Sequence, residues 1–92
     1  MPGAKEFGDD IWGLAMPTII YVKGYRLYFV SFDGTERMHV HVRKGNQNAK
    51  VWIGSLTFAW SQFREHDSFE ILRIVKGNEH LIREKWDEYF SE

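Results

Sequence analysis

Two histidines separated by a single residue are the sharpest chemical feature of this sequence. His39 and His41 alternate with Val40 and Val42. In a β-strand, residues two apart lie on one face, roughly 6.5 to 7 Å from each other, so both imidazoles would project into the same space. The alternation also predicts that the valines face a hydrophobic core and that the histidines lie on a polar face.

One interpretation of the pair is a metal site. Two imidazoles fill only two coordination positions, and a stable zinc or iron site needs at least a third ligand. The sequence offers Asp33, Glu36, His66 and His80, but no short spacing selects one of them. Because the ligand set is incomplete, we expect no metal and no cofactor.

A second interpretation is acid–base catalysis. Two imidazoles that titrate near neutral pH would support metal-free cleavage of a phosphodiester, with His39 and His41 as acid and base. Arg43 shares their face, and Lys50 would reach it across the following hairpin, so that both cations would stabilise charge on the phosphate. The candidate catalytic residues are therefore His39, His41, Arg43 and Lys50. The third interpretation is a solvated polar face, which any half-buried antiparallel strand presents.

A tryptophan and several cations surround the histidine pair. Trp52 lies on the same side as Lys50 if its strand is regular, and Arg37, Arg43 and Lys44 add positive charge to the hairpin. Tryptophan can stack on nucleic-acid bases or anchor a protein interface. We therefore expect a partner-binding surface around Trp52, Arg43 and Lys50. The acidic residues that gather near the C-terminus give a charge asymmetry that suits an oppositely charged partner.

The elements that must position these side chains form an α+β domain. Alternating apolar residues predict strands at 18–22, 25–32, 38–43, 49–53 and, more briefly, 56–60. Lys23-Gly24 and Asp33-Gly34 are expected to supply turns between them. We predict a small antiparallel sheet of four to five strands with two C-terminal helices packed on it.

The two helices are expected to meet near Gly77. Asp67 and Glu70 resemble a capping box that would begin the first helix, and Gly77 would end it in a left-handed conformation. Phe69 is expected on its buried stripe, and Asn78 would cap the second helix. A single bent helix over 68–90 is the alternative.

Length and composition limit the remaining possibilities. The chain has 92 residues, which supports one core, and seven Phe, four Trp and four Tyr can fill it. We expect a single domain over 16–92, preceded by an N-terminal extension or arm over 1–15.

There is no cysteine, which excludes disulfides and cysteine-based zinc sites. No apolar run approaches the roughly 18 residues of a membrane span, and the net charge of −1 gives no overall attraction to nucleic acid. We expect a cytoplasmic protein with no membrane partner, and any RNA binding would need a local basic patch.

Several short motifs together resemble a small bacterial family that is classed as a domain of unknown function. They are Met16-Pro17-Thr18-Ile19, Gly24-Tyr25-Arg26, Phe29, Ser31, Glu36, His39-Val40-His41-Val42, Ala49-Lys50-Val51-Trp52, Leu72, Ile74 and Trp86. The resemblance implies that residues 1–15 precede the domain proper. It also implies a small partner protein encoded nearby, because such proteins often lie beside another small gene in toxin–antitoxin-like pairs. Where the family has two prolines, this chain has Arg37-Met38, so a rigid approach to the histidine strand is not expected.

The leading functional expectation is a small cytosolic protein–protein interaction module, as one component of such a two-gene system. The alternatives are a metal-free, His-dependent ribonuclease or phosphodiesterase and a DNA-binding autoregulator. The last has less support, because no predicted helix carries a basic recognition cluster.

Overall fold

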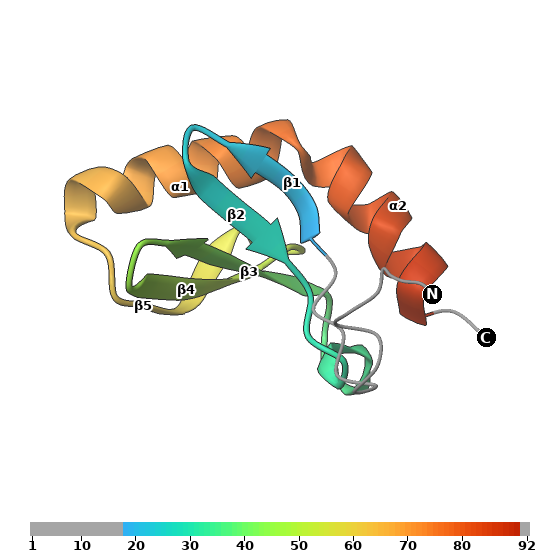
Figure 1. The fold of residues 1–92 in the computed structure, drawn as a ribbon. Coiled ribbons are helices and arrows are strands. Elements are labelled where there is room, and N and C mark those ends of the chain that lie inside the picture. The colour runs from blue at the N-terminus through green and yellow to red at the C-terminus, as the bar shows by residue number, and fades with distance from the viewer. Residues whose placement is uncertain (1–17, 91–92) are drawn as a thin grey trace.

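The computed structural model describes residues 18–90 (Figure 1). The expected extension over 1–15 lies outside the described residues, as does the expected start of the domain at residue 16. Five strands form one antiparallel sheet and two helices follow it, so the predicted α+β fold is confirmed. In chain order the elements are β1 (Thr18–Val22), β2 (Tyr25–Tyr28), the 3₁₀ turn η2 (Asp33–Thr35), β3 (His39–Lys44), β4 (Gln47–Trp52), β5 (Thr57–Ser61), α1 (Glu65–Gly77) and α2 (Glu79–Phe90).

Each strand of the sheet is hydrogen-bonded to its neighbours in the sequence, in the order β1-β2-β3-β4-β5. The β1–β2 turn consists of Lys23 and Gly24, with φ angles of 51° and 84°, as a tight two-residue hairpin requires. Across the β3–β4 hairpin, His39 lies opposite Trp52 and His41 opposite Lys50. Four of the five candidate residues are therefore close neighbours on one face of the sheet.

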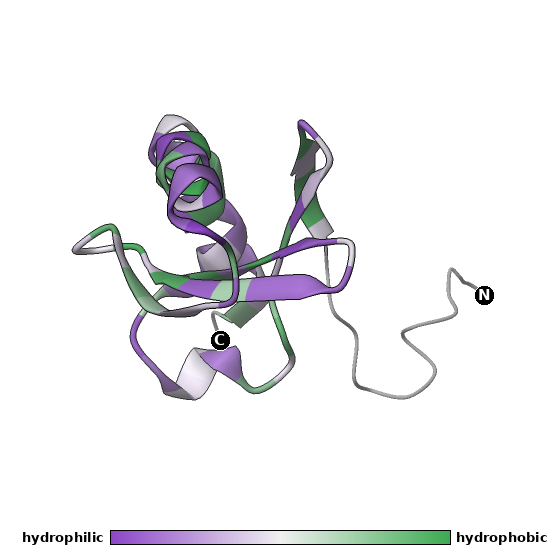
Figure 2. Cartoon of the chain, turned by 90° about the vertical axis from the view of Figure 1, so that its left-hand side faces the viewer, coloured by the Kyte–Doolittle hydropathy of each residue, from purple (hydrophilic) through white to green (hydrophobic). Residues whose placement is uncertain are grey.

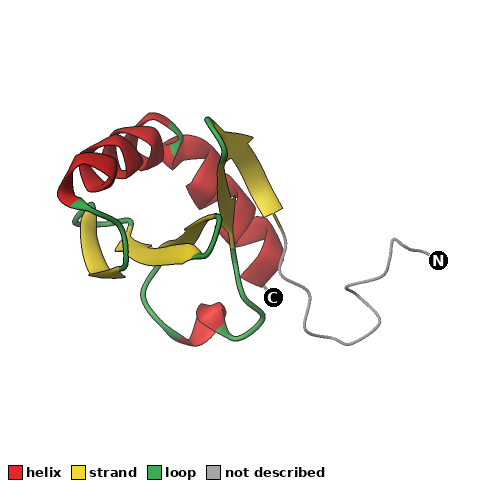
Figure 3. Ribbon diagram, turned by 60° about the vertical axis from the view of Figure 1, so that its left-hand side comes forward, coloured by secondary structure: helices red, strands yellow, loops and turns green. Residues whose placement is uncertain are grey.

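The hydrophobic core lies between the sheet and the helices (Figure 3). Val40 and Val42 are fully buried, which confirms that the valines of the histidine strand face the core. Residues from both helices complete the core: Ile71, Ile74 and Val75 from α1, and Ile82 from α2. Figure 2 shows hydrophilic and hydrophobic residues along both helices, as expected of helices with one buried face. None of the helices within residues 18–90 is long and apolar enough to cross a membrane.

The connection between β2 and β3 differs from the prediction. β2 ends at Tyr28 instead of residue 32, and the chain then forms a loop that contains η2. The Asp33 carboxylate accepts a hydrogen bond from the Val30 N–H at 2.7 Å, so this aspartate closes a turn of its own and not a two-residue hairpin. The loop lies on the side of the sheet opposite α1, and its η2 turn reaches the end of α2 (Figures 1 and 3). It therefore lies on the same side as the histidines.

The start of α1 also differs from the prediction. The helix begins at Glu65, and its N-cap residue, Arg64, makes no side-chain capping bond. Asp67 lies within the first turn, where its carboxylate still stabilises the helix by interacting with the positive end of the helix dipole. Phe69 is 61% exposed, so its expected place on the buried stripe was wrong.

The junction between the helices is formed by Asn78. Gly77 is the last residue of α1 and does not adopt a left-handed conformation, contrary to the prediction. The Asn78 side chain instead donates to the Ile74 carbonyl at 2.8 Å and so satisfies an end group of α1. The Asn78 carbonyl accepts the Ile82 N–H at 2.9 Å, which starts the second helix. Residues 65–90 thus form two helices, not one bent helix.

Candidate functional site

Asp33 joins the two histidines in one compact cluster. The His39 Nε2 atom lies 2.9 Å from Asp33 Oδ1, and the His41 Nε2 atom lies 3.1 Å from Asp33 Oδ2. One potential ligand atom from each of the three side chains lies within 4.8 Å of the other two. Of the four third ligands that the sequence offered, the fold selects Asp33. We call these three residues the His–Asp cluster.

Local packing explains how Asp33 reaches the histidines. The η2 turn lies against the end of α2, and a Cβ atom added to Gly34 would be only 2.7 Å from Cδ1 of Phe90. Such a separation is much shorter than the roughly 3.5 to 4.0 Å of ordinary carbon–carbon contacts. The absence of a side chain at residue 34 therefore lets η2 lie close to α2, which in turn sets the position of the Asp33 carboxylate.

His39 has an unusual hydrogen-bonding environment. Its Nδ1 atom lies 2.8 Å from the Arg37 carbonyl oxygen, which can only accept, so Nδ1 carries a proton and donates it. In a neutral imidazole the Nε2 atom is then a lone-pair acceptor, and it lies next to a carboxylate oxygen that is also an acceptor. The ring is fully buried, and Nε2 makes no hydrogen bond of acceptable geometry. A buried acceptor that lies against a carboxylate needs a proton or a cation between the two groups.

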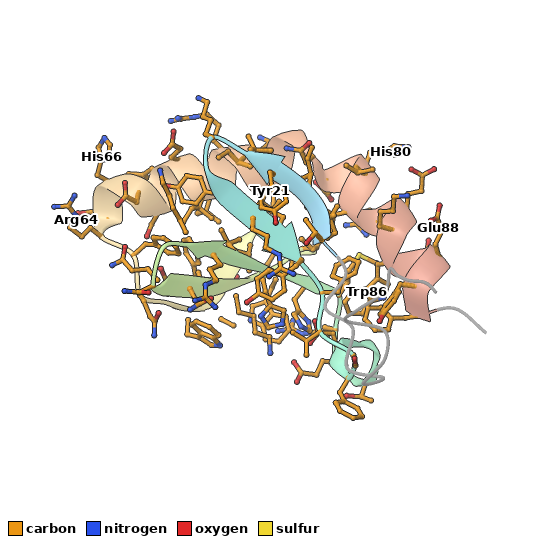
Figure 4. The ribbon with its side chains drawn as sticks, in the orientation of Figure 1. Tyr21, Arg64, His66, His80, Trp86 and Glu88 are labelled. Carbon is orange, nitrogen blue, oxygen red and sulfur yellow. The ribbon has the colours of Figure 1, made fainter. Side chains whose placement is uncertain are left out.

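Aromatic rings enclose the His–Asp cluster. The His39 ring centroid lies 5.6 Å from that of Trp52 and 5.5 Å from that of Trp86, and the His41 ring stacks on Tyr28 at 5.3 Å. Trp86 comes from α2 and extends towards the histidine side of the sheet, as Figure 4 shows. These rings exclude solvent from His39, which is fully buried, and so strengthen electrostatic interactions at that end of the cluster.

Burial and hydrogen bonding shift the acidity of the cluster. Burial opposes ionisation of Asp33, but hydrogen bonds with the Val30 N–H and with His41 outweigh it and lower the pKa of this carboxyl below its usual value. Burial also lowers the pKa of His41, and the Asp33 carboxylate offsets only part of that effect. Asp33 therefore favours its anionic form and His41 its neutral form, which are the forms that bind metal ions.

Lys50 lies beside the cluster but has partners of its own. Its Nζ atom is 2.6 Å from Glu36 Oε1, and this hydrogen bond lowers the pKa of Glu36. The same ammonium lies 4.8 Å from the Trp52 ring centroid. The predicted position of Lys50 on the histidine face is therefore correct, but its charge is already paired with a carboxylate.

Trp52 borders a small hollow at the end of β4. Arg37 lies over the Trp52 ring, with its guanidinium carbon 4.4 Å from the ring centroid. The hollow has a volume of about 140 Å³ and is lined by Arg37, Met38, Trp52, Gly54, Ser55 and Arg83. We call this set the Trp52 hollow.

The remaining candidates lie elsewhere. Arg43 is exposed at the end of the β3–β4 hairpin, where its Nε donates to the Gly45 carbonyl at 3.1 Å. His66 and His80 lie on the two helices, on the side away from the cluster, as Figure 4 shows. A larger pocket of about 220 Å³ between β1 and α2 is lined by none of the three cluster residues.

Sequence reasoning missed two parts of the site. The sequence left Asp33 as one of four possible third ligands. It could not select Asp33, because the shape of the loop that carries this residue depends on the contact between Gly34 and Phe90, which lie far apart in the chain. Trp86 was one of the residues that carry the family resemblance, but nothing in the sequence placed it beside the histidines. Its contact with His39 follows from the way α2 extends past the end of β3.

The fold and this site define a small α+β domain: a five-stranded meander with two helices on one face and a histidine–aspartate cluster on the other. The model of the family described as "Domain of unknown function (DUF4160)" matches residues 24–87, and the chain belongs to that family. No curated protein and no solved structure matches the chain.

Proposed function

We propose that this chain is a small protein–protein interaction module that binds an acidic segment of a partner protein at the Trp52 hollow. The observation that carries the proposal is the combination, in one concave site, of a half-buried tryptophan with two arginines, Arg37 and Arg83. Tryptophan and arginine are the residues that most often dominate the energy of protein interfaces, and they do so in pockets. Arg83 already forms an ion pair with Glu79, with Nη2 2.9 Å from Oε2, so Arg37 is the main cation that the hollow offers to a partner aspartate or glutamate.

The surface continues beyond the hollow. Trp60 on β5 lies opposite Lys50 and is 46% exposed, and Arg43 adds a cation at the far end of the hairpin. α1 lies on the other face of the sheet (Figure 1), and α2 reaches this side only at its edge, where Arg83 lines the hollow and Trp86 packs on His39. We propose that Lys50 and Arg43 contribute mainly to the rate and specificity of association, as charges at the rim of an interface do.

A protein partner has more support than RNA. Binding of nucleic acid depends on several cations that neutralise phosphates. On this face Lys50 is already paired with Glu36, and the Trp52 ring lies beneath Arg37 instead of offering an open stacking surface. Neither helix has a basic cluster suited to the groove of DNA, which weighs against the autoregulator.

The metal-free nuclease also has less support. General acid–base cleavage needs two imidazoles that can both reach one phosphate. His39 is fully buried, and both rings are directed at the Asp33 carboxylate, whose negative charge would repel the phosphate.

We further propose that the partner is a small protein encoded beside this one, in a toxin–antitoxin-like pair in the bacterial cytoplasm. The support is the family resemblance noted in the sequence, together with a domain that has an uncovered arginine- and tryptophan-bearing face.

The test is binding of the purified chain to the product of the adjacent gene, measured by calorimetry. Arg37→Glu reverses a charge in the hollow, and Arg73→Glu reverses one at an exposed position on α1, so the two variants are matched. We expect Arg37→Glu to weaken binding at least tenfold, the size of effect that truncating or reversing an interface anchor produces, and Arg73→Glu to leave it within about twofold.

Equal binding by both variants would contradict the proposed surface, and so would the absence of any complex with the folded wild-type chain. Binding of single-stranded RNA that falls steeply with salt, without a protein complex, would favour the RNA alternative and overturn the proposal.

A further inference from the structure

The geometry of the His–Asp cluster points to a binding site for a divalent first-row transition-metal ion, and we propose that Asp33, His39 and His41 are its ligands. In the sequence, a metal site was one interpretation of the histidine pair, but no third ligand could be selected. The fold supplies that ligand from the η2 turn. This inference does not depend on the proposed interaction with a partner protein.

The distances suit a shared ion. Zinc binds histidine nitrogen and carboxylate oxygen at roughly 2.0 to 2.2 Å, so ligand atoms around one tetrahedral ion lie roughly 3.3 to 3.5 Å apart. In the cluster, the two imidazole–carboxylate separations are 2.9 and 3.1 Å, and all three ligand atoms lie within 4.8 Å of one another. Two ligand atoms at the 4.8 Å limit would have to approach each other by about 1.3 to 1.5 Å, which two side chains can share as movements of about 0.7 Å each.

The His39 hydrogen bonds provide the second, independent observation. Its Nδ1 proton is committed to the Arg37 carbonyl, which leaves the Nε2 lone pair directed at the carboxylate. This arrangement, with one nitrogen donating to a backbone carbonyl and the other free to coordinate, is the usual outer-shell support of a metal-bound histidine. Nε2 is buried and has no hydrogen-bond partner, so a cation between it and Asp33 would satisfy both groups.

Asp33 is held in place in a similar way. Its Oδ2 atom accepts the Val30 N–H at 2.7 Å, so the carboxylate is oriented before any ion arrives. The His41 and Asp33 side chains keep 15% and 10% of their surface exposed, whereas His39 keeps none. An ion would therefore enter from the His41 side and keep open coordination positions there.

The ligand types restrict the ion. Two imidazoles disfavour Mg²⁺ and Ca²⁺, which prefer all-oxygen sites. Two histidines and one carboxylate with open positions suit Zn²⁺ or Fe²⁺, and three protein ligands are typical of zinc sites that keep a position for water or substrate.

The test is calorimetric titration of the full chain with Zn²⁺, with Co²⁺ absorption spectra as a second readout. The wild-type chain is expected to bind one Zn²⁺ per molecule. Asp33→Asn keeps an oxygen acceptor for Val30 but loses the charged ligand, and His41→Ala removes a ligand from the more exposed edge of the cluster. Each is expected to weaken zinc binding by more than the 10- to 100-fold that loss of an outer-shell partner causes.

The matched control is His66→Ala combined with His80→Ala, which removes two exposed histidines outside the cluster. Its zinc affinity is expected to equal that of the wild type. Circular dichroism of each variant checks that it is folded. Absence of stoichiometric zinc binding by the folded wild-type chain would overturn the proposal, and so would equal affinity in folded Asp33→Asn and His41→Ala.

Discussion

The close contact between Gly34 and Phe90 yields a sharp prediction about how the site is positioned. Substitution of Gly34 by alanine would place a Cβ atom 2.7 Å from Phe90 Cδ1, 3.0 Å from its Cγ and 3.2 Å from its Cβ. Favourable carbon contacts lie at about 3.5 to 4.0 Å, so either η2 or the phenyl ring must move by most of an ångström.

The expected loss follows from the nature of the obstacle. Overpacking in a well-packed region destabilises a protein by about 1 to 3 kcal/mol. Phe90 is the last residue of α2, and its ring is a side chain that can turn, so the lower half of that range, about 1 to 2 kcal/mol, is expected. For a domain of this size, this corresponds to a fall in the melting temperature of about 4 to 16 °C.

Urea denaturation of Gly34→Ala measures this loss, and Gly54→Ala is the matched control. A Cβ atom at Gly54 would meet nothing within 4 Å, and Gly54 has no positive φ. Its substitution is therefore expected to change the free energy of unfolding by no more than about 0.5 kcal/mol, or to raise it slightly. In a Phe90→Ala background the loss from Gly34→Ala should shrink by at least about 0.5 kcal/mol, because the obstacle is gone. A loss of the same size in both backgrounds would refute the reasoning.

Three further predictions concern the helices and the core. Gly77→Ala is expected to raise the free energy of unfolding by about 0.5 kcal/mol in urea denaturation, since Gly77 ends α1 without a left-handed φ and a Cβ atom there meets nothing within 4 Å; a loss would contradict this. Tyr25→Phe is expected to lower it by about 0.5 to 1.5 kcal/mol at neutral pH, because the hydroxyl donates to Glu70 Oε1 at 3.1 Å. Burial, together with Glu70, raises the pKa of Tyr25 to about 12 from its ordinary 10.0, so the stability linked to the protonated phenol is complete below pH 10 and is lost as the pH rises through 12. The difference in stability between wild type and Tyr25→Phe should therefore shrink over that interval, and a constant difference would contradict the assignment.

Local patterns in the sequence predicted the sheet well. The alternation around His39 and His41 placed both valines in the core, and the hairpin placed Lys50 on the histidine face. These features depend on strand periodicity and on one short turn, both of which are encoded by neighbouring residues.

Contacts between distant segments were not predictable in the same way. The end of β2 at Tyr28 and the η2 turn depend on Asp33 closing its own turn and on Phe90 filling the space beside Gly34. The start of α1 ahead of Asp67 likewise lacks the side-chain capping bond that a sequence motif would reveal. Because the Gly34–Phe90 contact joins distant segments, the sequence could not identify Asp33 as the third member of the cluster, although an aspartate was among the expected ligand types.

The two proposals concern neighbouring but separable parts of one face. Trp52 contacts His39 on one side and lines the hollow on the other, so a bound ion and a bound partner would share this ring as a common wall. Arg37→Glu is expected to weaken partner binding and to leave zinc binding largely intact, because its carbonyl, not its side chain, supports His39. Asp33→Asn is expected to do the reverse, provided that the variant folds.

The most direct test of the His–Asp cluster as a site is anomalous diffraction at the zinc edge from crystals grown with zinc. The account predicts a single strong peak bonded to the Nε2 atoms of His39 and His41 and to a carboxylate oxygen of Asp33, at about 2.0 to 2.2 Å. Zinc found only at exposed histidines such as His66 and His80, with His39 still in direct contact with Asp33, would contradict it.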